Sequence, residues 1–176
     1  MARPYQPSLL RLLHGPTAAL VSLAWLSGLL LYSNDDGRWG RLPLRLGGDW
    51  IDIHGSIGVL LWPLAILFAL YAVSVGRRQL QKPANAITLL ALALAVGSGK
   101  LMDEDWLKDG QLDHVVYSVH LLAWLVMAGA VLVHILAVLQ RGGVPLVRSM
   151  ASLRIRANDM PRDWPGQIRR ALTWRG

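Results

Sequence analysis

Two histidines, His120 and His134, lie inside one apolar stretch of 25 residues, 115–139. Their separation of 14 residues is close to four turns of an α-helix, so both imidazoles point to the same side, with a rise between them of about 21 Å. The stretch is long enough to cross a bilayer as one helix. Ionisable side chains inside such a helix are rare and usually functional. The spacing therefore predicts two separate sites, each about two turns inside one membrane surface.

Two further histidines lie early in other apolar runs, and each is followed directly by a glycine. His14 lies in the run 9–32 and His54 in the run 50–75, whereas a third run, 86–102, contains no histidine. Because the apolar residues are gathered into long runs, we expect lipid to surround this fold. Together with the stretch described above, these runs predict an all-α, four-helix transmembrane up-down bundle.

The lysines and arginines are distributed unevenly between the predicted loops. With a cytoplasmic N-terminus, 13 of the 18 fall on inner segments and five on outer loops. Positive charge marks the cytoplasmic side of a membrane protein, so both termini are expected in the cytoplasm. Residues 1–145 are expected to form the transmembrane domain, and residues 146–176 a basic cytoplasmic tail. Because the tail directly follows a membrane helix, its expected partner is membrane lipid and not nucleic acid.

This topology assigns a depth to each histidine. His14 is early in an outward-going helix and His134 is late in an inward-going one, so both are expected near the cytoplasmic face. His54 and His120 are both early in inward-going helices, so both are expected near the outer face. The four histidines are therefore expected to form two pairs of matched depth.

Two imidazoles at each depth favour haem binding over zinc binding. A zinc site takes three or four ligands from the protein or water, most of them protein, whereas a haem iron needs only two axial ligands beyond its porphyrin. Gly15 and Gly55 would relieve crowding where a porphyrin lies against a helix. The chain has no cysteine, which excludes iron–sulfur clusters, thiolate metal sites and covalent c-type attachment. Two axial protein ligands leave no open position for oxygen, which indicates electron transfer.

The residues alone leave other roles open. The histidines could instead make interhelical hydrogen bonds or belong to a proton relay, although a relay normally includes intramembrane Asp, Glu or Lys. The apolar runs have almost none of these away from their ends. His114 is expected to be an interfacial side chain and Met127 a packing residue. Several basic residues either pair with haem propionates or contact phospholipid: Arg11, Arg41, Arg45, Arg77, Arg78, Lys100 and Arg141.

Four features carry a resemblance to a known family: RLLHG at 11–15, DIHG at 52–55, a third helix without histidine, and two histidines with 13 residues between them in the fourth helix. Over roughly residues 8–145 the chain resembles the bacterial cytochrome b561 family. It is also similar to the b-type cytochrome subunits of membrane hydrogenases and formate dehydrogenases, but the hydrogenase-type subunits have an additional helix. The resemblance implies two non-covalent b haems, with His14 and His134 as ligands of the inner haem and His54 and His120 as ligands of the outer one.

The resemblance also implies an electron carrier that often exchanges electrons with quinone. We expect an integral-membrane di-haem b-type cytochrome of the bacterial inner membrane, or of the thylakoid membrane in a cyanobacterium. It would carry electrons across the membrane between quinol or quinone and a redox protein, as a homo-oligomer or as a subunit of a larger complex. One alternative is a haem-bearing membrane anchor of a larger oxidoreductase complex, and another is a haem-free, histidine-based proton or metal transporter.

Overall fold

The computed structural model describes residues 5–40, 42–102 and 111–173. Arg41 and most of the acidic connection before the fourth long helix, residues 103–110, lie outside the described residues. The described part of the chain is helical and without strands, as the sequence predicts. Its five α-helices are α1 (Ser8–Asp35), α2 (Trp50–Val73), α3 (Pro83–Met102), α4 (Gln111–Met150) and α5 (Trp164–Thr173).

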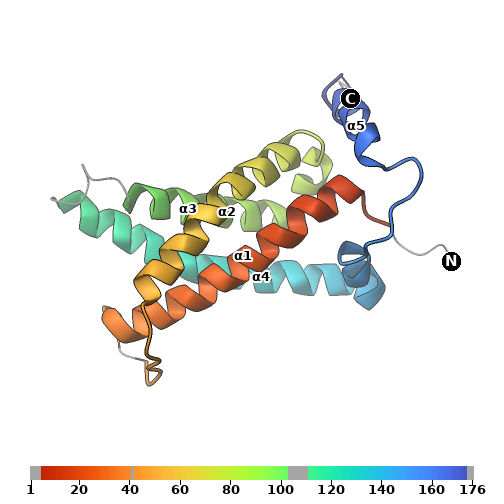
Figure 1. Cartoon of the computed structure of the whole chain (residues 1–176). Coiled ribbons are helices and arrows are strands. Elements are labelled where there is room, and N and C mark those ends of the chain that lie inside the picture. The colour runs from red at the N-terminus through yellow and green to blue at the C-terminus, as the bar shows by residue number, and fades with distance from the viewer. Residues whose placement is uncertain (1–4, 41, 103–110, 174–176) are drawn as a thin grey trace.

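The first four helices run alternately up and down and form a bundle (Figure 1). α1 packs chiefly against α2, and α3 chiefly against α4, so the bundle consists of two helical hairpins. A short 3₁₀ helix, η1 (Arg77–Gln81), lies between the hairpins. Each of the four helices is long and apolar enough to span a membrane, and only 17–22% of each apolar span is buried inside the protein. Most of this apolar surface is therefore available to lipid.

Three of the four long helices extend further than the apolar runs of the sequence, whereas α2 ends at Val73, two residues before the end of its run. α1 continues to Asp35, and α3 begins at Pro83, where proline is tolerated because the first N–H groups of a helix have no partner within it. α4 continues to Met150, with a break at Gly143, where φ is 59° and ψ is −162°. Glycine tolerates this conformation because it has no Cβ. The regular helix is therefore interrupted at Gly143, and a second helical segment follows it to Met150.

The hydrophobic core lies midway along the bundle. Its buried residues come from α2, α3 and α4: Leu61, Ala65, Ala91, Leu92, Met127 and Ala130. Met127 is seven residues from both His120 and His134, so it lies about 10 Å along α4 from each of them. Only 4% of Met127 is exposed, which confirms its predicted packing role. The alanines at this level let the helices approach closely.

A pair of stacked indoles joins α1 to α4. The rings of Trp25 and Trp124 are 5.0 Å apart between centroids, with 12° between their planes. Each indole N–H donates to the backbone carbonyl of the other residue, at 3.2 Å from Trp25 and 3.1 Å from Trp124. The reciprocal bonds give both N–H groups a partner where no water is available. They also fix the rotation of α1 relative to α4, the two helices that carry His14 and His134.

The tail after α4 returns to the start of α1, at the end of the bundle opposite the α1–α2 connection (Figure 1). Pro7, at the N-cap of α1, makes no side-chain capping bond, and Asp159 supplies one. Its carboxylate accepts hydrogen bonds from the Ser8 backbone N–H, at 2.6 Å, and from the Tyr5 hydroxyl. Trp164 Nε1 donates to Ser8 Oγ at 2.9 Å. A negative charge stabilises a helix N-terminus, so Asp159 holds the tail and the start of α1 together.

Replacing Asp159 with asparagine is expected to release the tail from α1. Burial raises the pKa of Asp159, but the hydrogen bonds from Tyr5, Gln167 and Ser8 outweigh burial and hold the pKa below its ordinary value of 3.8. The stabilisation of the docked tail by the Asp159 carboxylate is therefore fully present above pH 3.8. It is lost as the pH falls through the lowered pKa of Asp159. At neutral pH, trypsin should cleave after the exposed Arg154 faster in Asp159→Asn than in the wild type, as measured by mass spectrometry of the fragments.

Asp163→Asn provides the matched control for this variant. The Asp163 carboxylate accepts a hydrogen bond from the Met160 backbone N–H within the tail itself, so its loss should leave the docking intact. If Asp159→Asn were cleaved no faster than Asp163→Asn and the wild type, Asp159 would not hold the tail in place.

Candidate haem sites

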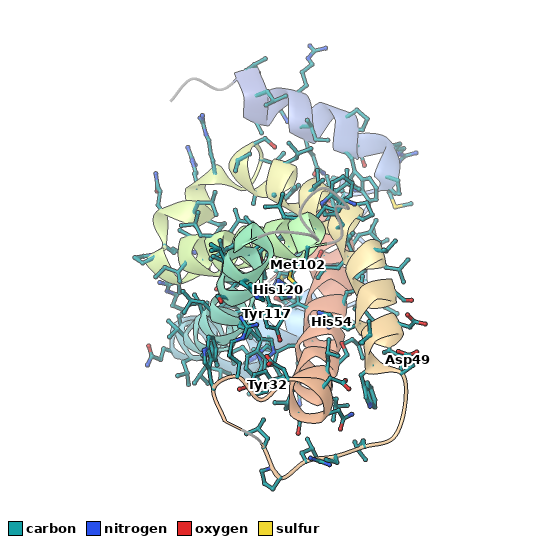
Figure 2. The ribbon with its side chains drawn as sticks, turned by 90° about the vertical axis from the view of Figure 1, so that its left-hand side faces the viewer. Tyr32, Asp49, His54, Met102, Tyr117 and His120 are labelled. Carbon is teal, nitrogen blue, oxygen red and sulfur yellow. The ribbon has the colours of Figure 1, made fainter. Side chains whose placement is uncertain are left out.

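The structure brings the four histidines together in two pairs. His14 of α1 and His134 of α4 have ring centroids 6.2 Å apart, with 35° between the ring planes. His54 of α2 and His120 of α4 have ring centroids 6.1 Å apart, with 75° between the planes. Figure 2 views the bundle from the end with the α1–α2 connection, and His54 and His120 lie between the helices. The fifth histidine, His114, is exposed on α4.

The separation within each pair suits a single metal ion between the two rings. A metal–imidazole bond measures about 2.0–2.1 Å, and the bond lengths of a five-membered ring put its centre about 1.1 Å from the nitrogen. Two imidazoles on opposite sides of one iron would therefore have centroids about 6.3 Å apart. The described residues contain no group of three or more His, Cys, Asp or Glu that could hold a metal. Two opposed imidazoles fit the axial positions of a haem better than a zinc site, which needs more ligands.

In the His54–His120 pair, a serine from a neighbouring helix contacts each ring. Ser27 Oγ of α1 lies 3.0 Å from His54 Nδ1. Ser98 Oγ of α3 lies 3.0 Å from His120 Nδ1. A hydrogen bond at Nδ1 leaves Nε2 as the nitrogen available to a metal.

In the His14–His134 pair, the two rings have different neighbours. His134 Nδ1 lies 3.2 Å from Asn85 Oδ1. The Asn85 amide is oriented by its own donor, because Nδ2 donates to the Gln79 carbonyl at 2.9 Å. Phe68 meets the His14 ring edge-on, with 5.8 Å between ring centroids. One ring of this pair is therefore held by an amide, and the other is packed against an aromatic ring.

Arg11 lies one turn before His14 and has a buried donor without an acceptor. Only 8% of Arg11 is exposed, and its Nε has no hydrogen-bond partner among the described residues. One of its terminal nitrogens donates to the Arg154 carbonyl at 2.8 Å. A buried donor without a partner costs free energy. A carboxylate brought by a bound group, such as a haem propionate, would satisfy Arg11 Nε.

A polar cluster lies close to the His54–His120 pair, at the end of the bundle that faces the viewer in Figure 2. The Tyr117 hydroxyl donates to Asp36 Oδ2 at 2.5 Å. The Arg38 guanidinium lies 4.4 Å from the centre of the Tyr117 ring. Tyr117 is three residues before His120, so the cluster begins about one helical turn from the pair.

The neighbours of the imidazoles were not predicted from the sequence. Ser27, Ser98 and Asn85 are ordinary residues in the apolar runs or in a polar turn, and no spacing argument identified them. At Gly15 and Gly55, an added Cβ would meet no atom within 4 Å, so their predicted role beside a porphyrin stays a prediction.

Four helices long enough and apolar enough to span a membrane, with two close pairs of imidazoles between them, are typical of membrane helix bundles that hold a cofactor in their core. The sequence model of the family described as prokaryotic cytochrome b561 matches residues 5–152. The match covers most of the chain, so the chain belongs to the prokaryotic cytochrome b561 family. Comparisons with curated proteins and with solved structures gave no match. Membership of this family implies b-type haem in a membrane protein.

Proposed function

We propose that the chain is a membrane electron carrier that binds two b haems without covalent links. His14 and His134 would hold one haem, and His54 and His120 would hold the other. The observation that carries this proposal is the separation of 6.2 and 6.1 Å between the paired rings. It matches the separation of about 6.3 Å expected for two imidazoles on one iron.

The haem would supply one-electron redox chemistry, and the protein would supply its position and surroundings. Ser27, Ser98 and Asn85 orient three of the four rings through Nδ1. Arg11 Nε would donate to a propionate of the haem held by His14. Because two histidines would hold the haem at each site, the arrangement favours electron transfer over oxygen chemistry.

The two sites lie at different depths, and this separation supports electron transfer across the membrane. His120 and His134 are about 21 Å apart along α4. Each site lies about 10 Å from the core residue Met127, so the two sites lie on either side of the middle of the bundle. Electrons would enter at one site and leave at the other, in the inner membrane of a bacterium or in the thylakoid membrane of a cyanobacterium.

The Tyr117–Asp36 cluster supports quinol or quinone as one of the two redox partners. Quinol oxidation releases protons together with electrons, so it requires proton acceptors beside the redox centre. Asp36 offers a carboxylate that can accept a proton, and it accepts a hydrogen bond from Tyr117, which is about one turn from His120. We therefore assign the exchange with quinone to this end of the bundle.

We expect both termini to be cytoplasmic. The tail docks on the start of α1 through Asp159, which supports placing both termini on the same side of the membrane. The excess of lysine and arginine identifies this side as the cytoplasm. A reporter fused after Gly176, or inserted within Arg77–Lys82, should report the cytoplasm, and a reporter near Gly37 the exterior. An externally accessible C-terminus would reverse the sides assigned to the two sites.

Electron transfer by the purified wild-type protein in proteoliposomes tests the proposed function. A reductant supplied on one side should reduce a membrane-impermeant acceptor trapped on the other side. If the protein were a haem-bearing anchor, electrons would cross only after a partner subunit is added. A haem-free proton transporter would change the internal pH without reducing the acceptor.

A further inference from the structure

The two hairpins of the bundle share a five-residue sequence pattern. α1 contains Ala24-Trp25-Leu26-Ser27-Gly28, and α3 contains Ala95-Val96-Gly97-Ser98-Gly99, both of the form Ala-x-x-Ser-Gly. In each hairpin, this segment lies on the first helix, and the histidine that its serine contacts lies on the second helix. We call the two segments the ASG segments.

The serine of each ASG segment is placed to accept a hydrogen bond from its histidine. The Ser27 hydroxyl donates to the Ala24 carbonyl at 3.1 Å. The Ser98 hydroxyl donates to the Leu94 carbonyl at 2.6 Å. A serine has one hydroxyl proton, and donation to the backbone leaves the lone pairs of Oγ to accept a hydrogen bond.

A serine that donates to the backbone favours one tautomer of each imidazole. An Oγ acceptor 3.0 Å from Nδ1 requires the proton of the neutral ring to be on Nδ1. The lone pair is then on Nε2, the nitrogen that would bind iron. An acceptor at Nδ1–H also increases the basicity of the ligating nitrogen.

The glycine of each ASG segment makes room for the same ring. A Cβ added at Gly28 would lie 3.2 Å from His54 Cε1, and one added at Gly99 would lie 3.1 Å from His120 Cε1. Both separations are tighter than ordinary van der Waals contact. Each ASG segment therefore fits one imidazole, with an acceptor for Nδ1 and free space beside Cε1.

The other histidine pair lacks this arrangement. His134 has an amide acceptor, Asn85 Oδ1, at 3.2 Å, and the aromatic neighbour of His14 is Phe68. The described structure therefore gives the His54–His120 site two matched serine acceptors and the other site a single amide.

We propose that Ser27 and Ser98 are positioning residues that fix the tautomer of His54 and His120 and lower the midpoint potential of the haem between them. This inference rests on the proposed function. The serines would act through the imidazoles: a more basic ligand stabilises oxidised iron, which lowers the potential. Gly28 and Gly99 complete the arrangement by admitting the rings.

The test measures two quantities in the purified protein, the haem-to-protein ratio and the midpoint potential of each haem by optical redox titration. Ser27→Ala and Ser98→Ala should each raise the potential of one haem and leave that of the other unchanged. The affinity for the affected haem should fall about 10–100-fold, as for other partners of metal-bound histidines. Ser27→Thr, which keeps a hydroxyl, should restore the wild-type potential.

Ser22→Ala is the matched control. Ser22 lies on α1 and donates to the Ala18 carbonyl at 2.9 Å, as Ser27 does to Ala24, but its side chain is exposed. It should keep both wild-type potentials. A His134→Ala background, which retains only the haem of the other pair, identifies the haem that responds to Ser27→Ala.

The outcomes separate this inference from the proposed function. Two results would support the inference. One is a raised midpoint potential of one haem in a serine-to-alanine variant, and the other is complete loss of that haem while the second haem is retained. Wild-type potentials and full occupancy in both Ser27→Ala and Ser98→Ala would contradict the inference and leave the two-haem proposal intact. Wild-type protein that binds no haem would contradict the proposed function, and this inference with it.

Discussion

His54→Ala and His120→Ala are each expected to lose one haem, and His14→Ala and His134→Ala are each expected to lose the other. Each variant would remove one of the two histidines that hold a haem, so retention of that haem should fall strongly. The two pairs are about 21 Å apart along α4, with the core around Met127 between them. The intact pair should therefore keep its haem, and the haem-to-protein ratio should fall from two to one.

His114→Ala is the control for these four variants. His114 is also on α4, but its side chain is exposed and belongs to neither pair. It should retain two haems and the low-spin electron paramagnetic resonance signals of iron with two imidazole ligands. If each pair variant lost both haems while its helical content stayed that of the wild type, the two sites would not be independent.

Electron transfer across the membrane is expected to fall to the background of empty liposomes in His120→Ala and in His134→Ala alike. The two variants remove haems at different depths, but the proposed path uses both haems in series. The chain has no cysteine, so an iron–sulfur cluster or disulfide cannot replace either step. The measurement is reduction of an impermeant acceptor trapped inside proteoliposomes.

Equal amounts of folded protein in each liposome sample, and His114→Ala as the active control, make this comparison quantitative. Flux that persisted in His134→Ala would mean that the His54–His120 site alone connects the two sides. Wild-type liposomes that hold both haems but reduce no acceptor would favour the anchor function over the carrier function.

The all-helical fold and the four apolar spans could be predicted because they depend on the length and hydropathy of each run. The depths of the histidines followed from the order of the helices, since rise per residue is a property of the helix itself. His54 and His120 are 66 residues apart in sequence, yet both lie early in helices that run in the same direction. The structure brings these two rings to 6.1 Å.

The partners of the imidazoles could not be predicted in the same way. Whether Ser27 faces His54 depends on the rotation of α1 about its axis and on the packing of the hairpin. The reciprocal bonds of Trp25 and Trp124 contribute to that rotation, and they are visible only once α1 and α4 are packed. The repeated Ala-x-x-Ser-Gly pattern was present in the sequence, but without the contacts it had no assigned meaning.

The docking of the tail on α1 could not be predicted from the sequence either. Asp159 caps α1 from 151 residues away along the chain, and no local pattern connects the two segments. Sequence reasoning expected a separate basic tail, because composition reports charge and not contacts.

The most direct test of the two-haem account is the haem-to-protein ratio of the purified wild-type chain, measured together with its optical spectrum before and after dithionite. The account predicts two haems per chain, both released by acidic organic solvent because no cysteine attaches them, with reduced spectra of low-spin b-type haem. A ratio of one haem per chain, or protein that folds and spans the membrane without haem, would contradict it.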